Sequence, residues 1–268
     1  MMESKNKYSA DVKVISGNNS LLNNADAFSE SLVSYLEEDE IKKINFDSKN
    51  SLKDFLKDFV VGKINNEYQK LTLPSKEIKD VINETLKKCE SVLEKDILRI
   101  YVFPTYSKFT IERMNCVNGF CVGKGVILIG LYPKGDWKKE ISFTLTHELA
   151  HAISPYYEMS SLSIGEGIVF DGLAENFRMK FLGGNVSPWA SSISEKEAIT
   201  YFKGFKDKLD NNSSGFYREV FFGSGKYPLW TGYTIGYYLV KKYLENLKEI
   251  NWREILIKNP KDILKKIV

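Results

Sequence analysis

The chain has 268 residues, of which 43% are hydrophobic and 13% are aromatic. This composition is rich enough to bury a sizeable core, so a disordered chain is excluded. The formal net charge is only +3, from 38 basic and 35 acidic residues, and gives no reason to expect nucleic acid as a partner. The longest apolar run, Val126–Leu131, has the length of a strand and is too short to cross a bilayer.

The first residues are polar and lack the apolar stretch of a secretory signal. The cysteine count is 3, and an odd number does not suggest a disulfide framework. We therefore expect a cytoplasmic protein that does not associate with membranes.

The N-terminal part of the chain is rich in charge, and its apolar residues recur with helical spacing. Leu32, Tyr35 and Leu36 share one face, and the same spacing recurs in Leu52, Phe55, Leu56 and Phe59. A further helix is predicted from Ser75 to about Glu94, beginning after Pro74. We predict a mainly helical N-terminal region over residues 1–72 and one larger domain over residues 73–268.

The pattern changes to strands in the middle of the chain. Ile97–Phe103 is strand-like, and Asn118-Gly119 is a pair typical of a two-residue hairpin turn. The turn would join a strand at 111–117 to one at 120–131, and would place Cys116 and Cys121 opposite each other as free thiols.

The strand at 125–131 directly precedes the next predicted helix, and two interpretations stay open. It is either an edge strand that pairs with an extended peptide or an ordinary core strand, and its run of branched apolar residues suits both.

Helical periodicity then continues to the C-terminus. One helix begins near Ile141, carries the apolar stripe Ile141, Leu145 and Leu149, and is closed by Pro155. Another is predicted over about 168–182 and is ended by Gly183-Gly184. Within 73–268 we expect the sheet and metal helices over 97–184 and a helical C-terminal subdomain over 190–268. Helices, a small sheet and further helices, in that order, indicate an α+β fold.

The first of these helices contains His147-Glu148-Leu149-Ala150-His151, the H-E-x-x-H pattern. Residues four apart lie one turn apart on one helical face, so both imidazoles can bind one zinc ion. Glu148 would then lie beside the metal, where it can act as general base towards a metal-activated water. The chain has only 2 histidines, so a chance spacing of two solvated or core histidines is the less favoured interpretation.

A carboxylate from a later element is expected as the third zinc ligand. The candidates are Glu158, Glu166, Asp171 and Glu175. Glu175 is favoured because it has the longer reach and neighbours that are expected to be buried. Asp171 would then either hydrogen-bond a ligand histidine or favour the helix dipole as an ordinary first-turn carboxylate.

Thr146–His151 followed by Asp171–Glu175 resembles the gluzincins, in which H-E-x-x-H and a later helical glutamate hold zinc. More narrowly, the chain is similar to the YjaZ-like predicted zinc-dependent proteases. Their Glu-Gly-Leu-Ala-Glu segment corresponds to Asp171–Glu175, which begins here with aspartate, and their Gly-Tyr-rich helix corresponds to Trp230–Tyr237. The resemblance runs from about Ser75 to the C-terminus.

This resemblance implies a zincin-like, thermolysin-like fold with a small mixed sheet, an H-E-x-x-H helix and a helical C-terminal part. It also implies Zn²⁺ as the cofactor and hydrolysis of a peptide or protein substrate. Zincins often stabilise the oxyanion with a later His or Tyr. Because no further histidine is present, the expected donor is Tyr233, with Tyr237 second.

Two other functions remain as alternatives. One is a non-catalytic, zinc-containing module that binds peptides or regulates a partner, although such a module has no need of Glu148. The other is a structural helix-rich protein in which the H-E-x-x-H pattern arose by chance.

Overall fold

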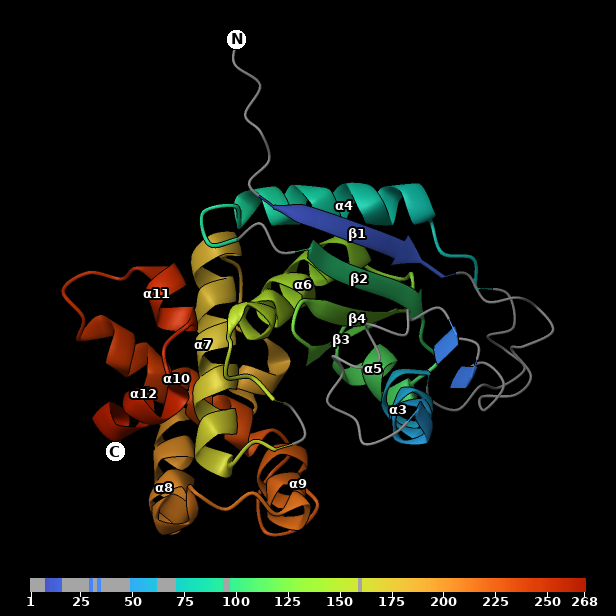
Figure 1. Ribbon diagram of the computed structural model, residues 1–268. Coiled ribbons are helices and arrows are strands. Elements are labelled where there is room, and N and C mark those ends of the chain that lie inside the picture. The colour runs from blue at the N-terminus through green and yellow to red at the C-terminus, as the bar shows by residue number, and fades with distance from the viewer. Residues whose placement is uncertain are drawn as a thin grey trace. The chain divides into compact units, whose positions relative to one another are not determined.

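The computed structural model describes residues 8–15, 29–30, 33–34, 49–61, 71–93, 97–158 and 161–268. The chain divides into two compact units, Met1–Ala152 and Ile153–Val268 (Figure 1). The predicted helical face of Leu32, Tyr35 and Leu36 lies outside the described residues.

A small mixed sheet forms the centre of the first unit (Figure 1). Its four strands are ordered β1-β2-β4-β3, with β1 parallel to β2, β2 parallel to β4, and β3 antiparallel to β4. Their bounds are β1 Ser9–Val14, β2 Ile97–Pro104, β3 Val117–Gly123 and β4 Val126–Leu131. β2 confirms the predicted strand at 97–103, whereas β1 was not predicted. The sheet and the many helices confirm the α+β class.

The predicted hairpin turn at Asn118-Gly119 is wrong, because both residues lie inside β3. The chain turns instead between β3 and β4, where Gly125 has a φ of +73°. Asn118 serves as a buried side-chain bridge: its Nδ2 donates to Thr110 Oγ1, and its Oδ1 accepts from Gly130 N. The expected strand at 111–117 begins in a helix, and Cys116 and Cys121 do not face each other across a turn.

The edge-strand interpretation of 125–131 is also wrong. β4 lies between β2 and β3, and all its residues are buried, so it is a core strand. The strand at this edge of the sheet is β3.

The helices of the first unit cover this sheet and supply its core. They are α3 Lys49–Phe55, the π-helix η1 Leu56–Val61, α4 Ser75–Lys88, α5 Lys108–Arg113 and α6 Trp137–Ile153. Leu52 and Leu56 are fully buried and pack in one cluster with Tyr101, Phe103 and Leu128. α4 runs beside β1 (Figure 1).

The described part of the second unit is helical. Its elements are α7 Ile164–Leu182, η3 Pro188–Ser191, α8 Glu195–Phe205, η4 Lys206–Lys208, α9 Ser214–Phe222, α10 Thr231–Glu245, α11 Trp252–Leu256 and α12 Pro260–Ile267. Within the described residues, no helix combines the length and the apolar character needed to cross a membrane.

α7 and α10 pack against each other through glycines. A Cβ atom at Gly172 would lie 2.3 Å from the carbonyl oxygen of Gly236, and one at Gly236 would lie 2.3 Å from the carbonyl oxygen of Ile168. Neither position has room for a side chain. The two glycines therefore let the helix backbones touch, which fixes α7 against α10.

Candidate metal centre

The H-E-x-x-H residues lie on the second half of α6, where every side chain from Thr144 to Ala152 is buried. His147 and His151 are 5% and 3% exposed. Their ring centroids are 5.1 Å apart, with an angle of 75° between the rings. The structure therefore brings these two imidazoles together on one face of the helix, as the spacing predicts.

The Glu148 carboxylate is held by the edge strand of the sheet. Its Oε2 accepts a hydrogen bond from the Cys121 backbone N–H at 2.7 Å, and both residues are buried. The Cys121 thiol is a neutral neighbour: burial, and secondly the charge of Glu148, raise the pKa of this thiol. Its Sγ donates to Gly123 O.

The opposite side of α6 is fixed by hydroxyl contacts. Thr146 Oγ1 donates to Ser142 O at 2.8 Å, and Thr85 Oγ1 on α4 donates to Ser142 Oγ at 2.9 Å. Cys89 Sγ lies 4.0 Å from Thr146 Oγ1, and burial raises the pKa of the Cys89 thiol to about 11. The Thr146 bond lies within α6, whereas the Thr85 and Cys89 contacts join α6 to α4 and its C-cap.

α7 begins at Ile164, four residues before the helix start expected near Ile168. The reason is a capping box in which Ser163 and Glu166 satisfy each other's backbone N–H groups. Glu166 Oε2 accepts from both Ser163 N and Ser163 Oγ. Of the other candidates, Glu158 accepts from Ser161 Oγ at 2.9 Å. Both carboxylates are thus engaged in local structure.

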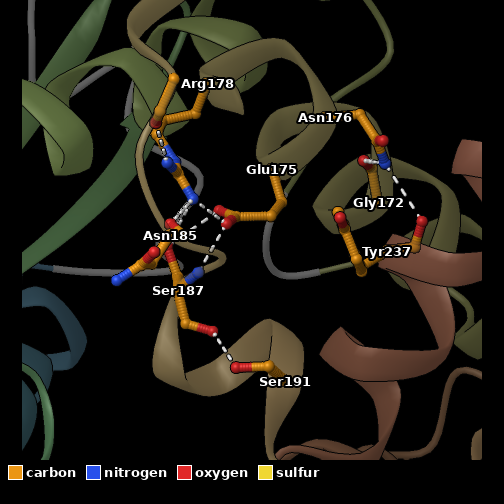
Figure 2. Close-up of polar contacts among 9 residues, drawn as sticks. Gly172, Glu175, Asn176, Arg178, Asn185, Ser187, Ser191 and Tyr237 are labelled. Atoms are coloured by element: carbon orange, nitrogen blue, oxygen red, sulfur yellow. Dashed lines mark hydrogen bonds and ion pairs between the residues drawn. The ribbon is translucent and has the colours of Figure 1, made fainter. Parts of the chain in front are cut away.

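Glu175 lies in a buried polar network on α7 (Figure 2). Its Oε1 pairs with the Arg178 guanidinium and accepts from Ser187 N at 2.8 Å, while Oε2 accepts from Ser187 Oγ at 3.0 Å. Arg178 also donates to the carbonyl oxygens of Gly183 and Asn185 at 2.7 and 2.8 Å. Both oxygens of Glu175 therefore tie the end of α7 to the segment that follows it.

Asp171 lies one helical turn before Glu175 and is only partly buried. Its charge acts on Tyr217, whose pKa is raised well above its usual range, first by burial and then by Asp171. The Tyr217 ring stacks on Phe221 with centroids 4.2 Å apart. It also packs against Gly167, where a Cβ would lie 3.0 Å from Tyr217 Cε2. Tyr217 was not predicted, because nothing in the sequence distinguishes it from the other tyrosines.

The two tyrosines expected to stabilise an oxyanion both lie on α10. Tyr233 is partly buried, and its ring packs edge-on against Phe221 with centroids 5.1 Å apart. Tyr237 is buried, and burial followed by the charge of Glu175 raises its pKa. Its carbonyl oxygen accepts from Asn176 Nδ2, which also donates to Gly172 O (Figure 2).

Among the described residues, His147 and His151 on α6 of the first unit could bind a metal ion, and Asp171 on α7 of the second unit offers a carboxylate. Two imidazole nitrogens and one carboxylate oxygen form a donor set that suits zinc and leaves a coordination position for water. The donor chemistry of the chain therefore fits a catalytic zinc ion.

Comparison with known proteins agrees with this chemistry. Residues 78–265 match the family described as "Predicted Zn-dependent protease (DUF2268)", and the chain belongs to this family. It is also similar to "Uncharacterized protein YjfC" of Bacillus subtilis (strain 168), with 22% identity over 194 residues, which cover 64% of each chain. No solved structure matches the chain. The similarity to predicted zinc-dependent proteases is thereby confirmed at the level of the family.

Proposed function

We propose that this member of the predicted Zn-dependent protease family is a zinc metallopeptidase with a zincin-like fold. The observation that carries the proposal is the arrangement on α6. Two buried imidazoles share one helical face, and the carboxylate between them in sequence is fixed by a backbone hydrogen bond. A mere structural helix has no need of this combination.

We assign Asp171 as the third zinc ligand, together with His147 and His151. The sequence favoured Glu175, but both oxygens of that carboxylate accept hydrogen bonds from Arg178 or Ser187. Turning Glu175 towards a metal would leave the buried guanidinium of Arg178 without its counter-charge, which costs about 3–5 kcal/mol. Asp171 lies one turn away on the same helix, and its carboxylate is only partly buried.

Bound zinc would act as a Lewis acid and lower the pKa of its water to about 7. With zinc bound, Glu148 would be the group that accepts a proton from the attacking water and donates it to the leaving amine. Because Oε2 is held by the Cys121 amide, we assign proton transfer to Oε1. Tyr233 remains the proposed oxyanion donor, with Tyr237 second.

The substrate class we propose is a peptide or protein. The free cysteines Cys89, Cys116 and Cys121 suit a reducing compartment such as the cytoplasm, where we place the reaction.

Metal analysis and peptide hydrolysis test the proposal together. We expect about one zinc per chain, and we expect Glu148→Gln to keep the metal while losing most of the hydrolysis of a broad peptide library. Asp171→Asn should lose zinc. A folded protein without zinc after growth in zinc-replete medium refutes the proposal. Zinc and peptide binding without any cleavage would instead indicate a non-catalytic peptide-binding module.

A further inference from the structure

The backbone of β3 lies directly against the side chain of Glu148. A Cβ atom at Gly119 would lie 2.4 Å from Thr144 Cγ2 and 2.8 Å from Glu148 Cγ. Real Cβ atoms do not approach other atoms so closely, so any side chain at position 119 must displace α6 side chains. The absence of a side chain at Gly119 therefore lets the strand backbone reach the helix.

The strand also binds the Glu148 carboxylate. The Cys121 N–H donates to Glu148 Oε2 at 2.7 Å, a short distance typical of hydrogen bonds to a charged acceptor. Cys121 is 1% and Glu148 7% exposed, so water competes little for this bond. β3 thus contacts α6 through both the aliphatic part and the carboxylate of the Glu148 side chain.

β3 is itself anchored, so it can serve as a fixed reference. It pairs with β4 along its length, and Asn118 ties it to Thr110 on α5 and to Gly130 on β4 at 3.0 and 3.1 Å. Its register shifts between Cys121 and Gly123, the irregularity typical of a β-bulge. A bulge redirects the strand at the residue whose amide meets Glu148.

We infer that β3 positions the general base: Gly119 sets the path of the Glu148 stem, and the Cys121 amide fixes Oε2 so that Oε1 is directed to proton transfer. Gly119 is a positioning residue in this scheme, since it acts only through Glu148. The inference rests on the proposed function for the role of Glu148, but the contact itself can be tested without catalysis.

Amide hydrogen exchange measures the contact in the full chain. In Glu148→Ala we expect the Cys121 amide to exchange at least tenfold faster than in the unsubstituted protein, because its acceptor is gone. The Gly130 amide, which donates to Asn118, should exchange at an unchanged rate. Equal exchange of the Cys121 amide in both proteins overturns the inference.

Kinetics measure the positioning. We expect Gly119→Ala to lower kcat at least tenfold, with KM within twofold and the zinc content unchanged. In a Glu148→Gln background the same substitution should cause no further loss, because it acts through the carboxylate that is already absent. The matched control is Gly204→Ala, where a Cβ meets nothing within 4 Å, and it should leave kcat unchanged.

Thr144→Ser distinguishes positioning from simple crowding. This substitution removes Cγ2, the atom closest to a new Cβ at position 119. The positioning role is refuted if Thr144→Ser restores kcat to the Gly119→Ala variant. It is also refuted if Gly119→Ala lowers kcat by the same factor in the unsubstituted protein and in the Glu148→Gln background. If the Cys121 amide behaves as expected but Glu148→Gln still cleaves peptides normally, the proposed function fails and the contact stands.

Discussion

Glu175→Gln is the substitution that best separates structural from metal-binding carboxylates on α7. Glu175 and Arg178 are 1% and 0% exposed, and the pair is surrounded by hydrogen bonds to Ser187, Gly183 and Asn185. Glutamine has nearly the same shape but no charge. Its N–H₂ group would also replace a carboxylate oxygen that accepts hydrogen bonds, so that two donors would face each other.

The expected cost follows from this burial. Removing one partner of a buried ion pair leaves an uncompensated charge and costs about 3–5 kcal/mol. That is a large fraction of the roughly 5–15 kcal/mol by which a folded protein is stable. We expect the melting temperature to fall by about 10 °C. The double variant Glu175→Gln/Arg178→Met should recover part of the loss, because no buried charge remains.

Thermal unfolding is the assay, with a chelator present so that zinc binding does not contribute to the stability. Glu249→Gln is the matched control: Glu249 is exposed, and its substitution should leave the melting temperature unchanged. The zinc affinity of folded Glu175→Gln should remain close to that of the unsubstituted chain. If this variant instead melts normally but has lost zinc, Glu175 is the ligand and the assignment of Asp171 is wrong.

Three further outcomes are expected. Gly172→Ala should lower the free energy of unfolding by about 1–3 kcal/mol, measured by urea denaturation, because its Cβ would overlap the carbonyl of Gly236; unchanged stability would contradict the contact. Because burial in the folded protein raises the Cys89 pKa from its ordinary value of 9.0 to about 11, the unfolded chain loses this proton first as pH rises. The free energy of unfolding should therefore decrease as the pH rises from the lower to the higher of these two pKa values, and it should decrease less steeply in Cys89→Ala. Thermal melts across this pH range measure the difference. Tyr233→Phe should lower kcat about 100-fold or more with little change in KM, and a larger effect of Tyr237→Phe would reverse that assignment.

The helix that carries the H-E-x-x-H pattern, and the shared face of its two histidines, could be predicted from the sequence. Helical spacing of Ile141, Leu145 and Leu149 predicts a helix that buries one face, and α6 buries all three. The four-residue spacing of His147 and His151 places both rings on one face of any regular helix. These two predictions depend only on the geometry of a regular helix, so they need no information about distant parts of the chain.

Interactions between distant segments could not be predicted from the sequence. Asn118-Gly119 has the residues of a tight turn, yet both are required by tertiary contacts: Asn118 bridges Thr110 and Gly130, and Gly119 makes room for Glu148. The edge position of β3 likewise depends on strand order, which local patterns do not specify.

The roles of the α7 carboxylates show the same division. The sequence by itself determined that α7 presents two acidic residues one turn apart, and it favoured the longer one as a ligand. Only the tertiary structure decided that Arg178 is fully buried and that Ser187 returns to meet Glu175, which engages that carboxylate. The physical reason is that a buried guanidinium requires a counter-charge. Tertiary packing decides which carboxylate supplies this charge, and the local sequence pattern does not specify that packing.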